Sequence, residues 1–156
     1  MAPREPLAQR IDHIGIVVHD ADAAAAYYRD TFGLQPGADV VLPDGSARLV
    51  YLEAGDTTLQ LVQPLRAGPA ADHLAARGEG LHHVCFAVSD LRHALASLPN
   101  EPDAVVSPGG RGLHVSFIGA RPNGVTIELT GPTTEAVPGD ETPAAPEVAW
   151  DSGHPG

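Results

Sequence analysis

The strongest constraint on the fold of this chain is an internal repeat. The stretch IDHIGIVVHD at residues 11–20 returns seventy residues later as LHHVCFAVSD at residues 81–90. Each copy has the apolar alternation of a strand and is followed by a helical pattern, and turn signals then separate three more short strands. The repeat predicts two similar units of strand–helix–strand–strand–strand, which 156 residues can bring together around a shared core.

The repeat divides the chain into five segments. We expect an N-terminal arm, a first βαβββ module, a linker with a short helix, a second βαβββ module and an acidic tail, at residues 1–8, 9–66, 67–80, 81–130 and 131–156. The tail is rich in Pro and Gly and carries five acidic residues and no basic one. Such a segment buries too little apolar surface to offset its loss of conformational entropy, so we expect it to be disordered.

Charge and composition exclude several classes of protein. The formal net charge is -11 and no basic cluster is present, which argues against a nucleic-acid partner. All nine basic residues are arginines, so no lysine is available for a Schiff base. The single Cys85 cannot form an internal disulfide, and neither an apolar signal core nor a membrane-spanning stretch is visible. We predict a cytoplasmic protein without a membrane partner.

Each half places a polar residue on its first strand and another on its last strand. These are His13 and Gln60 in the first half, and His83 and Glu128 in the second. Strand alternation places Ile11 on the face of His13 and turns His82 away from the face of His83, so His82 is the less suitable ligand.

Two imidazoles, an amide oxygen and a carboxylate are suitable ligands for a divalent ion such as Co, Mn, Ni, Zn or Fe. A set with one anionic member leaves net positive charge on the ion, and positions stay open for water or a chelating substrate. A single strand histidine is more often an ordinary core or surface residue. Four such residues at repeat-related positions favour a metal site over that interpretation.

Three strings carry a resemblance to a known family. IDHIGIVVHDADAAAAYYRDTFGL, GEGLHHVCFAVSDL and PNGVTIELT resemble the vicinal oxygen chelate (glyoxalase/bleomycin resistance/dioxygenase) superfamily, and most closely methylmalonyl-CoA epimerases, over roughly residues 9–130. The resemblance implies an α+β fold in which two paired βαβββ modules form a cupped mixed sheet around a metal site. It also implies the ligands His13, Gln60, His83 and Glu128. Glyoxalase I enzymes usually carry Glu at the position of Gln60, whereas the epimerases carry Gln.

The resemblance further implies a metal-dependent isomerase that epimerises a methylmalonyl-CoA-like substrate next to its thioester carbonyl, through a metal-stabilised enolate. Glu128 would be one catalytic acid/base group. The epimerases carry an acidic EEQG-like segment where this chain reads VVLPDGSARLVYLE. Asp44 is the nearest counterpart for the second group, although a turn residue is the simpler interpretation. Arg111 and Arg121 are candidates for binding the CoA phosphates, and the family commonly forms homodimers.

Two alternatives remain open at this stage. Without a second base, the same ligands suit another metal-dependent isomerase, lyase or cyclase acting on a small oxygen-chelating metabolite, including one of specialised metabolism. The superfamily also contains ligand-sequestering resistance proteins that perform no chemistry. Those proteins usually lack the metal ligands, so metal analysis of the purified protein distinguishes them from an enzyme.

Overall fold

The structure is a computed structural model, and it describes residues 5–99, 101 and 104–133. Residues 134–156 of the acidic tail, for which we predicted disorder, lie outside the described residues. The first half contains β1 (Arg10–Val17), α1 (Ala21–Phe32), β2 (Gln35–Val41), β3 (Ala47–Ala54) and β4 (Thr57–Pro64). The second half follows α2 (Pro69–Arg77) and contains β5 (Gly80–Ala87), α3 (Leu91–Ser97), β6 (Ser107–Pro108), β7 (His114–Phe117), the 3-10 turn η1 (Pro122–Gly124) and β8 (Ile127–Gly131).

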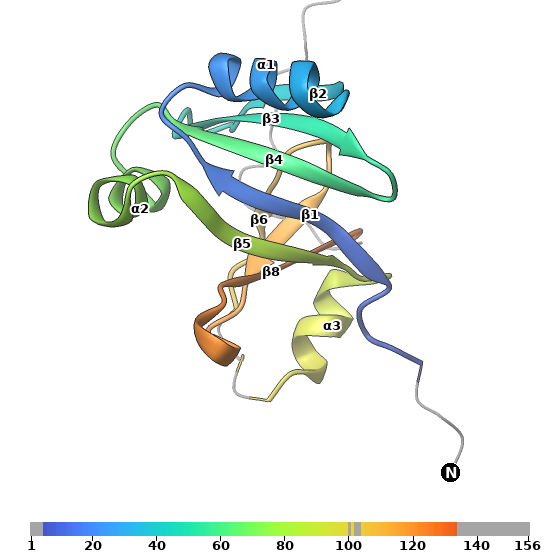
Figure 1. The fold of residues 1–156 in the computed structure, drawn as a ribbon. Coiled ribbons are helices and arrows are strands. Elements are labelled where there is room, and N and C mark those ends of the chain that lie inside the picture. The colour runs from blue at the N-terminus through green and yellow to red at the C-terminus, as the bar shows by residue number, and fades with distance from the viewer. Residues whose placement is uncertain (1–4, 100, 102–103, 134–156) are drawn as a thin grey trace, which may run out of the picture.

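The strands form one curled sheet in the order β2-β3-β4-β1-β5-β8-β7-β6 (Figure 1). At its centre, β1 and β5 are antiparallel, and each is parallel to the last strand of its own half, β4 or β8. The two halves therefore meet along the seam between β1 and β5. The predicted α+β fold with a cupped mixed sheet is confirmed.

Both principal helices begin with the same local device. Asp20 caps α1 by accepting a hydrogen bond from the backbone of Ala23, and Asp90 caps α3 by accepting one from His93. Helix α1 ends at Gly33, whose φ of 72° lies in the left-handed region that glycine adopts at little cost. The repeat thus fixes where each helix leaves its first strand.

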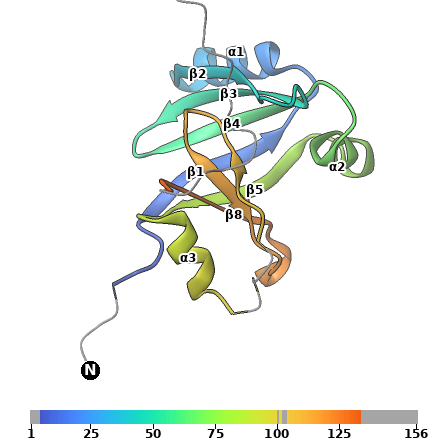
Figure 2. The same ribbon diagram turned by 180° about the vertical axis from the view of Figure 1, so that it is seen from behind.

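Helices α1 and α3 cover one face of the sheet, and the candidate site lies on the other face. Val50, Leu52 and Leu61 pack with residues of α1, and Leu129 packs with residues of α3. The two views in Figures 1 and 2 show α1 over the first half and α3 over the second. Because strand side chains alternate, Gln60 and Glu128 project from the face opposite to their neighbours Leu61 and Leu129.

Two β-bulges interrupt the pairing of β1 with β5. Between the pairs Ile11–Phe86 and His13–Cys85 one residue of β1 has no partner, and between Gly15–His83 and Ile16–Leu81 one residue of β5 has none. These extra residues are Asp12 and His82. A bulge re-aims the side chain at the irregularity.

The bulge at His82 corrects one expectation from strand alternation. His82 does not face away from its neighbour His83: both residues line the same cavity, and their Nδ1 atoms are 2.8 Å apart. The bulge at Asp12 has a parallel effect in β1. Asp12 is 2% exposed beside His13, whereas Ile11 is 39% exposed.

Candidate metal centre

Three ligand atoms from three strands converge on the open face of the sheet. His13 Nε2 on β1 lies 3.1 Å from His83 Nε2 on β5 and 3.1 Å from Glu128 Oε1 on β8. His83 Nε2 is 3.5 Å from the same carboxylate oxygen. Neighbouring ligands of an octahedral ion, each about 2.1 Å from it, lie roughly 3 Å apart. The three atoms therefore have the mutual spacing that one small cation requires.

The burial of the Glu128 carboxylate also fits a cation site. Its Oε1 atom is buried, and its ion-pair partners among the described residues are His13 and His83, which donate to it only when Nε2 carries a proton. A buried carboxylate oxygen without a partner is costly, and such groups usually pair or coordinate a metal. An ion held by these donors would satisfy that atom, so the residues present fit a divalent cation.

Gln60 lines the same cavity and lies across Gly15 from His83. Gly15 of β1 is paired with Gln60 on one side and with His83 on the other. A side chain at Gly15 would overlap the imidazole of His83, so only glycine leaves room for that ring. Gln60 Nε2 donates to the hydroxyl of Tyr51 at 2.8 Å, which leaves the amide oxygen free to act as a ligand.

Each candidate ligand histidine has an outer partner at the bulged residue before it. His13 Nδ1 is 2.7 Å from Asp12 Oδ2, and His83 Nδ1 is 2.8 Å from His82 Nδ1. Burial, together with the neighbouring His83 and His73, lowers the pKa of His82 to about 4, so it is neutral near pH 7. We assign both Nδ1 atoms of the ligand histidines as donors, which leaves both Nε2 lone pairs for a metal.

The charges around the site favour an ionised carboxylate. Burial raises the pKa of Glu128, but hydrogen bonds from His13 and His83 outweigh it and hold this pKa at about 2. Burial lowers the pKa of His13, but its hydrogen bonds to Asp12 and Glu128 prevail and raise it above the ordinary value. For Asp12, the contacts with His13 and Arg111 overcome burial and lower the pKa. In the metal-free protein, protons therefore compete with a cation for His13.

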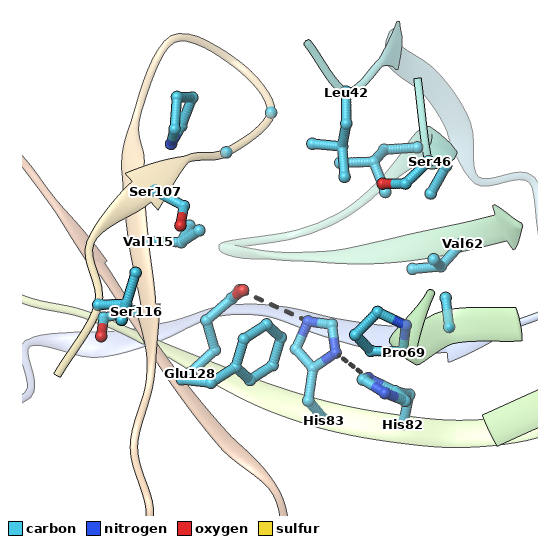
Figure 3. A pocket seen from close by; sticks show the side chains of 18 of the residues that line it. Leu42, Ser46, Val62, Pro69, His82, His83, Ser107, Val115, Ser116 and Glu128 are labelled. Atoms are coloured by element: carbon cyan, nitrogen blue, oxygen red, sulfur yellow. Dashed lines mark hydrogen bonds and ion pairs between the residues drawn. The ribbon is translucent and has the colours of Figure 1, made fainter. Parts of the chain in front are cut away.

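Gln60, His83 and Glu128 line a large open cavity of about 1030 Å³, and His13 contacts it through His83 and Glu128. Figure 3 shows His83 between Glu128 and His82, with Leu42 and Ser46 across the cavity. Much of the lining is apolar, including Leu49, Val62 and Val115. Its described carboxylates are Asp44, Glu101 and Glu128. A cavity with apolar walls and a few converging polar groups is the usual form of a small-molecule site.

The structure places the remaining predicted site residues in three different settings. Asp44 lines the cavity but is exposed, and its Oδ1 accepts the backbone N–H of Ser46 at 2.9 Å, as in a turn. Hydrogen bonds from Ser46 lower the pKa of Asp44. Arg111 contacts Asp12 and lies over the ring of Tyr51. Arg121 is exposed and donates to its neighbour Gly124. Neither arginine belongs to the cavity lining.

Asp12 and Ser116 went unrecognised in the sequence, and strand alternation set His82 aside as the less suitable ligand. Asp12 and His82 precede the two ligand histidines at repeat-related positions, and that coincidence is the signal that could have identified both. Ser116 lines the cavity on β7, and its hydroxyl is buried without a hydrogen-bond partner among the described residues. No pattern in the sequence distinguishes Ser116 from the other serines.

Comparison with known proteins agrees with this geometry. Residues 12–117 match the model of the Glyoxalase/Bleomycin resistance protein/Dioxygenase superfamily. The chain belongs to this superfamily. It is 33% identical over 128 residues to an ethylmalonyl-CoA/methylmalonyl-CoA epimerase of Cereibacter sphaeroides, an alignment that covers 77% of this chain and 96% of the relative.

Two solved structures show how far the fold is shared. The methylmalonyl-CoA epimerase of Mycobacterium tuberculosis has a TM-score of 0.75 at 27% identity, covering 83% of this chain and 92% of that one. A variant of the Streptomyces coelicolor methylmalonyl-CoA epimerase, in complex with 2-nitronate-propionyl-CoA, has a TM-score of 0.72 at 31% identity, covering 83% and 97%.

These relatives confirm two predictions, namely the superfamily and an enzyme of the racemase/epimerase type. The cluster of candidate ligand atoms agrees with the metal-dependent enzymes of this superfamily. In the described part of the chain, no helix combines the length and apolar character needed to cross a membrane.

Proposed function

We propose that this protein is a metal-dependent epimerase that acts at the carbon next to the thioester carbonyl of methylmalonyl-CoA or a similar acyl-CoA. One observation carries the proposal: the buried Nε2 atoms of His13 and His83 and Oε1 of Glu128 converge within 3.5 Å of one another beside a large cavity. The relatives named for acyl-CoA epimerisation support the choice of substrate.

His13, Gln60, His83 and Glu128 would hold a divalent ion, for which Co, Mn, Ni, Zn and Fe suit the mixed nitrogen and oxygen donors. When bound, the ion supplies positive charge that stabilises the negative charge developing on substrate oxygens. Both imidazoles and the amide are neutral ligands, so Glu128 provides the set's only negative charge. The site is therefore suited to an anionic, oxygen-rich substrate.

Epimerisation needs groups that remove a proton from one face of the carbon and return one to the other face. We propose Glu128 for one face, because its carboxylate lines the cavity beside the other candidate ligands. Asp44 is our candidate for the other face. The third carboxylate of the cavity, Glu101, accepts backbone hydrogen bonds from Gly119 and Ala120, which hold it to its own loop.

Substrate positioning involves further residues of the second half. Arg121 is exposed and remains our candidate for the CoA phosphates. Arg111, the other candidate, has its guanidinium engaged by Asp12.

The proposal is tested by following exchange of the substrate α-proton with deuterium from the solvent. Metal-loaded protein should incorporate deuterium into methylmalonyl-CoA and interconvert its two epimers. Glu128→Gln retains an amide oxygen like that of Gln60 but accepts no proton, so it should keep measurable metal binding and lose exchange. Absence of exchange in the metal-loaded, unsubstituted protein at high concentration would contradict the proposal.

A second function is favoured by the lining of the cavity. No arginine is among the cavity-lining residues that the structure describes, and the whole chain contains no lysine. This favours a small oxygen-chelating metabolite, converted by an isomerase, lyase or cyclase with the same metal ligands. Metal binding without exchange of any acyl-CoA would support this alternative. A ligand-sequestering protein is less suitable, because a site for capture alone has no need of the converging ligands.

A further inference from the structure

Asp12 is a buried carboxylate that is neither a candidate metal ligand nor one of the proposed acid/base groups. It is 2% exposed, and its Oδ2 atom is 2.7 Å from Nδ1 of His13. Arg10 reaches the other oxygen at 3.1 Å, and Arg111, in the loop between β6 and β7, contacts Oδ2. The carboxylate thus connects a candidate metal ligand to an arginine 99 residues away in sequence.

The loop that carries Arg111 is shaped to bring it there. Arg111 has a φ of 59°, in the left-handed region that costs a non-glycine residue energy and persists where surrounding contacts enforce it. Its guanidinium carbon lies 4.4 Å from the ring centroid of Tyr51, a cation–π contact. A side chain at Gly110 would overlap the Tyr51 hydroxyl, so the loop packs directly on that residue.

We propose that Asp12 and Arg111 are positioning residues for the first half's metal ligands. Arg111 holds the carboxylate of Asp12, and Asp12 holds the Nδ1–H of His13, so that Nε2 faces the cation site. A carboxylate in this place fixes the tautomer and ring orientation of a ligand histidine and increases its basicity. The proposal rests on the metal site of the proposed function, but it concerns affinity and ligand geometry and is independent of the substrate.

Through Tyr51, Arg111 also supports a second candidate ligand, Gln60. The ring of Tyr51 lies under Arg111, and its hydroxyl accepts the hydrogen bond from Gln60. Both ligands of the first half therefore depend on an arginine of the second half. His83 instead has its outer partner, His82, in its own strand.

The test measures Co²⁺ binding to metal-free protein by calorimetry, together with the visible absorption bands of bound Co²⁺. Arg111→Ala should weaken binding about tenfold, within the range known for outer partners of metal ligands, and shift the absorption bands. Arg111→Lys keeps the charge but loses the planar fork, so it should restore only part of the affinity. Arg48→Ala is the matched control: Arg48 also pairs with carboxylates, Asp22 and Asp39, and its side chain is 25% exposed against 27% for Arg111.

A double substitution separates positioning from a general loss of structure. Asp12→Asn should weaken Co²⁺ binding at least as much as Arg111→Ala. In free energy, the double variant should lose less affinity than the sum of the two single losses, because Arg111 acts in part through Asp12. Unchanged affinity and spectrum in Arg111→Ala, effects that simply add, or an equal loss in Arg48→Ala would each overturn the proposal. His83→Ala tests the metal site itself, and retention of Co²⁺ binding in that variant would refute the ligand assignment. If His83→Ala loses Co²⁺ binding while the Arg111 variants keep full affinity, only the positioning role is refuted.

Discussion

The two halves of this protein share a backbone plan but differ in what they build from it. Equivalent register positions carry His13 and His83, Gln60 and Glu128, and Gly15 and Cys85. Tyr51 and Phe117 are likewise equivalent, since each is paired with the polar residue of the neighbouring strand. Glu128 is charged whereas Gln60 is neutral, and Cys85 has a side chain whereas Gly15 has none. Tyr51 carries a hydroxyl that Phe117 lacks. The duplicated frame thus supplies symmetric positions, and the substitutions make the site asymmetric.

The halves also differ in extent. The strands β2, β3 and β4 have seven or eight residues each, whereas β6, β7 and β8 have two, four and five. The longer strands bury a larger core, and the shorter ones border much of the cavity. We infer that the first half contributes more to stability and that the second half determines more of the cavity's shape.

The largest expected effect tests this difference in stability. Leu61 and Leu129 directly follow Gln60 and Glu128, at equivalent positions, and are 0% and 5% exposed. Leu61→Ala should lower the free energy of unfolding by about 2–5 kcal/mol, the usual cost of truncating a buried leucine. Leu129→Ala should cost less, because Phe86 and Ile127 beside it are only partly buried. Urea denaturation of the metal-free protein measures both, and an equal or greater loss at Leu129 would contradict the comparison.

The next effect distinguishes Gly15 from Cys85. Gly15→Ala should displace the imidazole of His83 and weaken Co²⁺ binding by more than ~100-fold, beyond the range for outer partners of metal ligands. Cys85→Ala should leave binding close to that of the unsubstituted protein, since the buried thiol is not among the proposed ligands. Calorimetry decides between them. Similar affinities in the two variants would show that the close approach at Gly15 has no bearing on the site.

A third prediction uses pH to separate the two ligand histidines. The carboxylates of Asp12 and Glu128 outweigh burial and raise the pKa of His13. In metal-free protein, this pairing stabilises the fold below about pH 6.5, the unperturbed imidazole value, and its contribution is lost as pH rises through the raised pKa. A cation needs the neutral ring, so Co²⁺ affinity should increase over the same interval.

Histidine NMR titration and calorimetry across this interval provide the two measurements. Asp12→Asn should move the pKa of His13 downward, while His82→Ala leaves it nearly unchanged. Affinity for Co²⁺ that is constant from pH 6 to 8 would argue against His13 as a ligand.

The smallest effect compares Tyr51 with Phe117. Tyr51→Phe removes the hydroxyl that accepts from Gln60 and keeps the ring under Arg111. We expect a loss of about tenfold or less in Co²⁺ affinity, at the low end for outer partners. Phe117→Leu removes an aromatic ring 5.2 Å from that of His83 and should change affinity even less. A larger loss at Phe117 would reverse the roles assigned to these two residues.

The sequence predicted the fold because each copy of the repeat contains periodic patterns formed by residues close together in the chain. Alternation within β4 and β8 places Gln60 and Glu128 on one face without any knowledge of their partners. The capping aspartates and Gly33 likewise act within a few residues of the helices they bound. All of these features depend on neighbours in sequence, which a single chain displays directly.

The features that the sequence did not predict depend on contacts between elements far apart in the chain. The bulges at Asp12 and His82 exist only in the pairing of β1 with β5, so strict alternation gave the wrong face for His82. The position of Arg111 depends on a loop that packs across the sheet onto Tyr51. Ser116 is distinguished only by the burial of its hydroxyl. Such features follow from tertiary packing, which periodicity does not encode.

The antiparallel seam between β1 and β5 also has a consequence for folding cooperativity. Two of the proposed ligands lie on each side of it, so a bound ion would act as a cross-link between the halves without a covalent bond. An ion at 100 times its dissociation constant would add about 2.7 kcal/mol to the stability of the assembled form. Separation of the halves would forfeit that contribution entirely. The free concentration of the ion would then set how strongly the folded form resists separation of its two halves.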